Sequence, residues 1–218
     1  MSAWDRVWPA PAKINLFLHV VGRRADGYHL LQTVFRFLDH GDQLRFEPRS
    51  DGEILAACPL PGVSSDADLT VRAARLLRNE SGRKDGVTIH LTKRLPLGGG
   101  LGGGSSDAAT TLMALNRLWQ CGLSSIELQR LGLSLGADVP VFIHGRACFA
   151  EGVGDQFTDL ALPAAWYLVT IPGVSVPTAE IFRAPDLRRS TPAMAPAAWR
   201  PGLGDNDLEP VARRLFPE

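Results

Sequence analysis

A glycine-rich segment is the part of the sequence best suited to chemistry. Residues 96–107 read Pro-Leu-Gly-Gly-Gly-Leu-Gly-Gly-Gly-Ser-Ser-Asp, and six of the seven residues 98–104 are glycine. Glycine lets backbone N–H groups approach an anion closely and readily adopts positive φ. A helix expected to follow would add unpaired N–H groups and the positive end of its dipole. The segment therefore indicates phosphate binding, with a nucleotide as the expected ligand.

Other glycine motifs fit this segment less well. Gly98, Gly100 and Gly103 satisfy the G-x-G-x-x-G pattern of dinucleotide-binding folds. The strand before such a loop is continuously apolar, whereas residues 87–92 alternate as half-buried antiparallel strands do. A Walker A loop would place a lysine after its last glycine, and here two serines follow Gly104 directly. A glycine-rich surface turn remains the structural alternative.

Alternating and β-branched patterns predict the strands around this loop. Residues 87–92, Val-Thr-Ile-His-Leu-Thr, predict a half-exposed strand that leads into it. A hairpin in an antiparallel sheet is predicted from two strand-like runs, residues 30–38 and 43–47, that are joined by a turn at residues 39–42. Further strands are expected at residues 13–21, 139–149 and 166–171.

Capping residues predict where the helices begin. Asp68 is expected to begin a helix that ends at Gly82. Ser105, Ser106 or Asp107 is expected to cap the helix after the glycine-rich segment. Further helices are expected from the Ser124 and Glu127 capping box to Gly136, and after Asn206 or Asp207 near the end of the chain.

Composition excludes several classes of function. The 218 residues include 23 Lys and Arg and 23 Asp and Glu, so no basic excess attracts nucleic acid or an anionic membrane. Cys58, Cys121 and Cys148 are an odd number without Cys-x-x-Cys spacing, which disfavours a disulfide framework or a zinc cluster. No apolar signal core or membrane span is visible, and a cytoplasmic protein is expected.

The glycine-rich segment resembles the phosphate loop of the superfamily of galactokinase, homoserine kinase, mevalonate kinase and phosphomevalonate kinase. Other segments narrow the resemblance, because their order and spacing are similar to those of the 4-diphosphocytidyl-2-C-methyl-D-erythritol kinase family. These segments read PAKINLFL at residues 11–18, RADGYH at 24–29, GADVPVF at 136–142 and EGVG at 151–154. The resemblance covers nearly the whole chain.

This resemblance implies a two-domain α+β fold with mixed, mostly antiparallel sheets, helices on one face and an active site between the domains. Residues 1–160 would form the ATP-binding kinase domain, and residues 161–218 an incomplete C-terminal substrate domain. The implied activity transfers the γ-phosphoryl group of ATP, with Mg²⁺, to the 2-hydroxyl of 4-diphosphocytidyl-2-C-methyl-D-erythritol, in the non-mevalonate route to isoprenoid precursors. No nucleic acid or membrane partner is implied.

The same resemblance implies roles for the glycine-rich segment and two charged residues. ATP would contact Pro96, Leu97, Gly98, Gly99, Gly100, Leu101, Gly102, Gly103, Gly104, Ser105 and Ser106. Asp138 would be the catalytic base, and Lys13 would hydrogen-bond both the reacting oxygen and Asp138. Without the resemblance, Asp138 is a turn carboxylate and Lys13 an exposed residue at a strand end. The two serines could also simply cap a helix.

Polar and aromatic residues elsewhere could recognise the cytidine substrate. Asn15 lies two residues from Lys13 and therefore on the same face of the expected strand. Tyr28 could stack on cytosine while His29 meets its hydrogen-bonding edge. Phe182, after Thr178 at a possible helix start, could supply the opposite face. The simpler alternative is that these aromatic residues belong to the core.

Other functions remain open at this stage. Another kinase of the superfamily, acting on homoserine or a mevalonate, would keep the loop without a cytosine site. A catalytically silent nucleotide-binding protein or a truncated fragment would bind ATP without turnover. The resembled family has a further glycine-rich segment near its C-terminus that nothing after Phe216 supplies, and Val211, Leu215 and Phe216 form an apolar stripe with little sequence left to cover it.

Overall fold

The computed structural model describes residues 2–171, 173 and 176–217, which form two compact units. Unit 1 takes its described residues from 1–12, 38–97 and 102–145, and unit 2 from 13–37, 98–101 and 146–218. Strands β1 (Trp8–Arg23) and β2 (His29–Arg49) pair with each other and contribute to both units.

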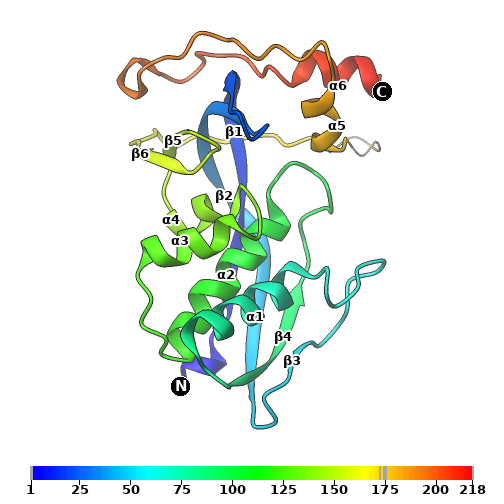
Figure 1. Cartoon of the computed structure of the whole chain (residues 1–218), viewed down its shortest axis with the longest axis vertical. Helices are drawn as coiled ribbons and strands as arrows, with labels where there is room; N and C mark the ends of the chain where they lie inside the picture. The colour runs from blue at the N-terminus through cyan, green and yellow to red at the C-terminus, as the bar shows by residue number, and fades with distance from the viewer. Residues whose placement is uncertain (1, 172, 174–175, 218) are drawn as a thin grey trace. The chain divides into compact units, whose positions relative to one another are not determined.

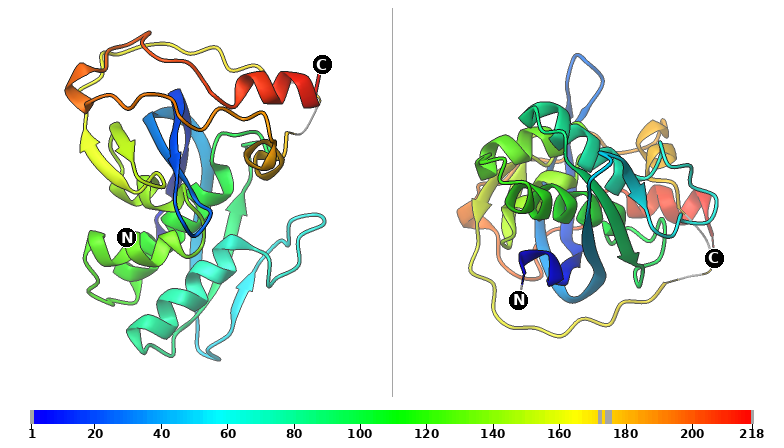
Figure 2. Two further views of the ribbon diagram at one scale, coloured as in Figure 1. Left: turned by 45° about the horizontal axis from the view of Figure 1, so that its top comes forward. Right: turned by 90° about the horizontal axis from the view of Figure 1, so that it is seen from below.

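Unit 1 joins a small sheet to a layer of helices. The second half of β2 pairs antiparallel with β4 (Gly86–Thr92), which pairs in parallel with β3 (Ile54–Ala56). Its helices are α1 (Leu69–Ser81), α2 (Gly103–Leu118), α3 (Ser125–Leu133) and α4 (Val139–His144), besides the short 3₁₀ turn Ala3–Asp5. Figures 1 and 2 show α1 to α4 together on one face of these strands. Leu44, Phe46, Leu77, Ile89, Leu112 and Trp119 fill the core between the layers.

Several predicted elements of unit 1 are confirmed. Asp68 caps α1 by accepting hydrogen bonds from the backbone N–H groups of Thr70 and Val71, and Gly82 ends it at φ +66°. Strand β4 occupies the alternating run, and Ser124 with Glu127 forms the capping box of α3. The predicted end at Gly136 is wrong, since α3 ends at Leu133.

The hairpin predicted around residues 39–42 is wrong, because β2 continues through them without a turn. Gly41 is required by a close approach, since an added Cβ would lie 2.2 Å from the carbonyl oxygen of Ala10 in β1. Asp42 is also not a turn residue. Its carboxylate is buried and accepts hydrogen bonds from Lys93 and from the N–H groups of Arg94 and Leu95.

The strand predicted over residues 139–149 is wrong for its first part and confirmed only at its end. Residues Val139–His144 form α4, with Pro140 in its first turn and Gly145 at its end with φ +71°, and only Cys148–Glu151 form a strand, β5. Proline suits the first turn of a helix because its missing N–H has no helical partner there. A short apolar run does not distinguish a buried helix from a strand.

Unit 2 contains the first half of β2, which pairs antiparallel with β5; β5 pairs antiparallel with β6 (Gln156–Asp159). It also holds α5 (Thr178–Arg183), the 3₁₀ turn Pro196–Ala198 and α6 (Glu209–Leu215). Val20 of β1, Ile181 of α5 and Val211 of α6 meet in one buried cluster with Leu187. The stripe that includes Val211 is therefore covered, although Leu215 stays 38% exposed.

Two further expectations in unit 2 are wrong. Helix α6 begins after Leu208, and Asp207 instead accepts hydrogen bonds from the N–H of Val20 and the hydroxyl of Thr191. Residues 166–171 form no strand and pair with no strand among the described residues (Figure 2). Trp166 and Leu168 are 102% and 93% exposed. Across the described parts of the chain, no helix is long and apolar enough to cross a membrane.

Candidate active site

The glycine-rich loop links β4 to α2 and has the backbone that its glycines predict. Gly98, Gly100 and Gly102 have φ of +72°, +70° and +73°. The stretch from Leu97 to Gly100 is exposed, and an added Cβ on Gly100 would meet nothing within 4 Å. Exposed backbone with alternating positive φ can direct successive N–H groups toward one anion. The geometry suits the cradle that the sequence indicates.

The serines after the loop do not cap α2, contrary to prediction. The helix begins at Gly103 with Gly102 as its N-cap, so Ser105 and Ser106 lie in its first turn. Ser106 is fully buried, and its Oγ has no hydrogen-bond partner among the described residues. Ser105 is half-buried and close to the segment before Asp138, since an added Cβ on Gly136 would lie 3.7 Å from its Oγ.

Asp138 occupies the N-cap of α4 in unit 1. Its backbone already has a helical conformation, with φ −85° and ψ −9°, and its side chain is half-buried. The residues that follow, Val139, Pro140 and Val141, are all buried. The packed first turn of α4 therefore holds the carboxylate at the edge of the core.

Lys13 is fixed by a short chain of hydrogen bonds in unit 2. Its side chain is 6% exposed, and Nζ donates to Asn15 Oδ1 at 2.7 Å. Asn15 Nδ2 in turn donates to Thr33 Oγ1 at 2.8 Å. The contact between the Lys13 and Asn15 side chains confirms that they share one face of β1. The backbone N–H of Lys13 donates to the carbonyl oxygen of Leu101 at 2.9 Å, which ties β1 to the glycine-rich loop. The predicted contact between Lys13 and Asp138 stays a prediction.

The aromatic candidates also lie in unit 2. His29 stacks on Phe182 with ring centroids 5.0 Å apart and an interplanar angle of 26°. Thr178 begins the same helix, α5, and is exposed. Tyr28 is 65% exposed beside the turn at Asp26, whose Oδ1 accepts its N–H. The structure thus brings His29 and Phe182 together and leaves the Tyr28 ring open to solvent.

Arg189 holds His29 in one protonation state. Its Nε donates to His29 Nε2 at 3.1 Å, and its Nη2 donates to the carbonyl oxygens of Phe182 and Ala184. A guanidinium can only donate, so Nε2 must be unprotonated and the ring proton sits on Nδ1. Burial, then the charges of Arg189 and Arg23, lower the pKa of His29. His29 is therefore neutral, with Nδ1–H as its donor.

The state of His29 can be measured by ¹⁵N NMR of the histidine rings. We expect His29 to protonate only below its ordinary value of 6.5, and Arg189→Met to move its pKa back toward 6.5. Because the folded pKa is lowered, His29 contributes stability above pH 6.5 that is lost as pH falls through the folded value. Arg188→Met, at the exposed neighbouring residue, is the control. An unchanged pKa in Arg189→Met would contradict this role.

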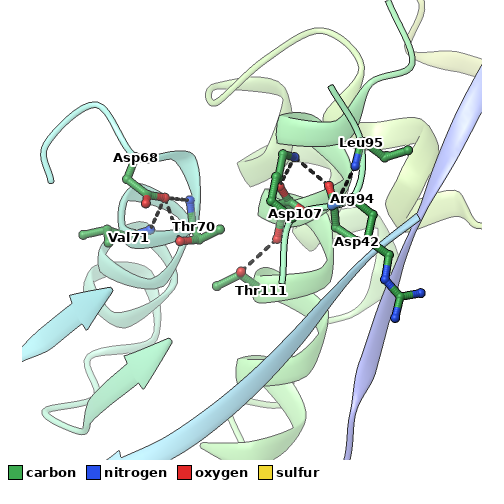
Figure 3. A network of polar contacts seen from close by, with 9 residues as sticks. Asp42, Asp68, Thr70, Val71, Arg94, Leu95, Asp107 and Thr111 are labelled. Carbon is green, nitrogen blue, oxygen red and sulfur yellow. Dashed lines mark hydrogen bonds and ion pairs between the residues drawn. The ribbon is translucent and has the colours of Figure 1, made fainter. Parts of the chain in front are cut away.

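Sequence reasoning missed a buried charge cluster in unit 1. Lys93 Nζ donates to Asp42 Oδ2 at 2.6 Å and to Asp107 Oδ2 at 2.8 Å. Asp42 and Asp107 are 1% and 2% exposed, and Figure 3 shows them close together between β2 and α2. Lys93 and Asp107 flank the glycine-rich loop in the sequence, but Asp42 lies 51 residues before Lys93, so only the fold reveals the cluster.

The three groups of this cluster do not ionise alike. Burial opposes the charge of Asp42, but hydrogen bonds from Arg94, Lys93 and Leu95 outweigh it and lower the pKa of Asp42. Burial also opposes the charge of Lys93, but the two carboxylates outweigh it and raise the Lys93 pKa. Burial raises the pKa of Asp107 to about 7, against the influence of Lys93, and the neighbouring Asp42 carboxylate adds to the increase. Asp107 Oδ1 has no hydrogen-bond partner among the described residues. Of the two carboxyl groups, Asp107 is therefore ionised less readily than Asp42.

Comparison with known proteins identifies the fold and the family of the chain. Residues 68–146, from the cap of α1 through α4, match the family model described as the GHMP kinases N terminal domain. A homoserine kinase from Cytophaga hutchinsonii ATCC 33406 shares the fold, with a TM-score of 0.57 at 18% identity over 81% of this chain and 58% of that one. The chain thus has the fold of the GHMP kinases.

More similar proteins narrow this class. The crystal structure of a 4-(cytidine 5'-diphospho)-2C-methyl-D-erythritol kinase has a TM-score of 0.79 at 39% identity, over 97% of this chain and 79% of that chain. A curated 4-diphosphocytidyl-2-C-methyl-D-erythritol kinase from Dechloromonas aromatica (strain RCB) is 66% identical over 97% of this chain and 77% of its own length. One from Thiobacillus denitrificans (strain ATCC 25259 / T1) is 60% identical over 98% and 77%. The chain belongs to the 4-diphosphocytidyl-2-C-methyl-D-erythritol kinase family, and the predicted α+β kinase fold is confirmed.

Proposed function

We propose that this kinase transfers the γ-phosphoryl group of ATP to the 2-hydroxyl of 4-diphosphocytidyl-2-C-methyl-D-erythritol, in the non-mevalonate route to isoprenoid precursors. The observation that carries the proposal is 66% identity, over 97% of the chain, to a curated relative of that name. The loop before α2 supports it, because its exposed backbone suits phosphate oxygens.

Asp138 is proposed as the base. Phosphoryl transfer passes through a loose transition state, so catalysis depends on positioning and on neutralising phosphate charge more than on a strong base. As the bond from the substrate oxygen to phosphorus forms and ADP departs, the hydroxyl proton passes to the Asp138 carboxylate. The first turn of α4 supports this role, because its buried residues fix the backbone that carries Asp138.

Lys13 is proposed to orient the reacting hydroxyl and to offset charge on the transferred phosphoryl group. The hydrogen bonds from Lys13 to Asn15 and from Asn15 to Thr33 support this role, since they fix a largely buried ammonium group in one geometry. Asn15 is proposed to contact the substrate from the same face of β1. Both side chains would therefore meet the substrate from positions that are already fixed by hydrogen bonds.

ATP is proposed to bind along residues 96–106 with Mg²⁺. The residues present fit the ion, because the hydroxyl of half-buried Ser105 is an oxygen donor in the first turn of α2 and Mg²⁺ takes its remaining ligands from phosphates and water. When bound, Mg²⁺ neutralises phosphate charge. Ser106 is a poorer ligand since its Oγ is buried.

The proposed cytosine site combines Tyr28, His29, Thr178 and Phe182, all of which belong to unit 2. His29 would offer its Nδ1–H to an acceptor on the base, and the exposed Tyr28 ring would stack on it. The division of function at residue 160 stays a prediction. A reducing cytoplasmic location is also proposed, because Cys58, Cys121 and Cys148 are free thiols.

Tyr28→Ala should raise KM for the cytidine substrate about tenfold or more, because stacking on a base contributes roughly 1–3 kcal/mol. The KM for ATP should change less than about twofold. Steady-state kinetics with each substrate varied in turn measures both. Tyr28→Phe keeps the ring and should behave like the wild type, and Tyr167→Ala, at the other tyrosine of the chain, is the control. An unchanged KM in Tyr28→Ala would remove Tyr28 from the site.

The function itself is tested by phosphorus NMR of the purified protein with Mg²⁺, ATP and the cytidine substrate. Parallel tubes contain homoserine or mevalonate in place of that substrate. A new phosphomonoester signal with the cytidine substrate alone is expected. A signal with homoserine or mevalonate instead would assign the chain to another kinase reaction. ATP binding without product in any tube would refute the proposed turnover.

A further inference from the structure

The buried cluster of Asp42, Lys93 and Asp107 lies at both ends of the glycine-rich loop. Asp42 Oδ1 accepts the backbone N–H groups of Arg94 at 2.5 Å and Leu95 at 2.8 Å, where the chain leaves β4 and approaches the loop. Lys93, beside them, joins Asp42 to Asp107, which lies in α2 just after the loop. One ammonium group therefore connects the entry of the loop to its exit.

The space around this connection is tightly filled. An added Cβ on Gly103, the first residue of α2, would lie 3.0 Å from Lys93 Nζ and 3.2 Å from Leu95 Cβ. The same Cβ would lie 3.4 Å from Asp42 Oδ2. The start of α2 therefore lies close to the lysine head group and leaves little room for a side chain at position 103. Close packing of this kind transmits displacement.

The charges also argue for a positioning role. The cluster holds two buried carboxyl groups for one lysine, one more acid than a single ion pair contains. Replacing buried ion pairs by apolar residues is often neutral or stabilising, so stability alone does not explain the cluster. Asp107 Oδ1 has no partner among the described residues, so its carboxylate is held by Lys93 through the other oxygen. A buried carboxylate retained with one unsatisfied oxygen is a poor stabiliser of the fold. The contacts of the cluster instead fix the distance between the two ends of the loop.

We propose that Asp42, Lys93 and Asp107 are positioning residues that hold the two ends of the glycine-rich loop at the separation required for nucleotide binding. The proposal rests on the proposed role of the loop as the ATP site. None of the three needs to touch ATP, because they act through the backbone of Arg94, Leu95 and the first turn of α2. Loss of the connection through Asp107 frees the exit of the loop while Asp42 still holds its entry.

Two substitutions of Asp107 separate geometry from charge. Asp107→Ala and Asp107→Asn both leave a neutral side chain at this position, but only asparagine keeps an oxygen that can accept from Lys93. A purely electrostatic role therefore affects the two variants equally, and by relieving repulsion it would tighten ATP binding in both. The positioning role weakens ATP binding about tenfold in Asp107→Ala, the effect of one charge-assisted hydrogen bond, and within about threefold in Asp107→Asn. Asp85→Ala removes a charge from an exposed ion pair of the same unit and is the control.

Equilibrium dialysis of ATP against the purified full chain measures these affinities, and hydrogen exchange of the backbone amides of residues 97–104 measures the loop without nucleotide. We expect the amide hydrogens of the loop to exchange faster in Asp107→Ala than in Asp107→Asn. The amide hydrogens of β4 should exchange at the same rate in both variants. Equal ATP affinities in the two variants, or unchanged loop exchange in both, overturns the proposal. Hydrogen exchange needs no nucleotide, so it tests the loop even if the wild-type chain fails to bind ATP, a failure that would refute the proposed function instead.

Discussion

Asp138→Asn is expected to lower kcat at least about 100-fold, because an amide cannot take the proton of the substrate hydroxyl and a positioned base contributes roughly 10²–10⁴-fold. The Kd for ATP should stay within about twofold of the wild-type value, since the glycine-rich loop is unchanged. Single-turnover phosphorus NMR measures the chemical step, and equilibrium dialysis measures ATP binding.

The control for this substitution is Asp66→Asn, which removes an exposed carboxylate of unit 1 that pairs with Arg75 on the surface. Wild-type turnover is expected in the control. Retained turnover in Asp138→Asn would mean that the proton leaves by another route. A parallel loss of ATP binding would instead mean that Asp138 supports the nucleotide site.

Gly41→Ala is expected to have the largest effect on stability. The new Cβ would lie 2.2 Å from the carbonyl oxygen of Ala10 and 2.6 Å from the Cα of Pro11, and both atoms belong to the backbone of β1. Backbone atoms cannot rotate away as a side chain can, so the two strands must separate. Overpacking of this severity costs about 3 kcal/mol or more, which lowers Tm by roughly 6–12 °C for a chain of this size.

Gly22→Ala is the matched control, because Gly22 lies in β1 and its added Cβ would meet Leu30 Cδ1 at an ordinary 3.4 Å. Thermal unfolding followed by circular dichroism compares the two variants. A Tm for Gly41→Ala within about 2 °C of the control would show that β1 and β2 do not approach as closely as described.

The predictable elements were those whose signals are local. Asp68 and Gly82 mark the two ends of α1 by chemistry that needs no distant partner, and the alternation of residues 87–92 reports one buried face. The glycine-rich loop was predictable for the same reason. Its backbone conformation follows from its own residues, as the positive φ of Gly98 and Gly100 confirms.

The elements that sequence reasoning missed depend on distant partners. Gly41 and Asp42 are typical turn residues, and only the approach of Ala10 and the charge of Lys93 explain why they lie inside a strand. Ser105 and Ser106 are good capping residues, but α2 begins before them, at Gly103 with Gly102 as its N-cap. The stacking of His29 on Phe182 joins residues far apart in the chain, and Arg189, which orients His29, carries no local signal at all.

The exposed residues 166–171 have a consequence for the protein in solution. They read Trp-Tyr-Leu-Val-Thr-Ile, with no charge, proline or glycine, and Trp166 and Leu168 are almost fully accessible. Cross-β assembly favours exposed segments of this composition. Self-association through this segment would increase with the number of molecular encounters. Protein concentration, more than temperature, is therefore expected to govern how long a preparation stays monodisperse.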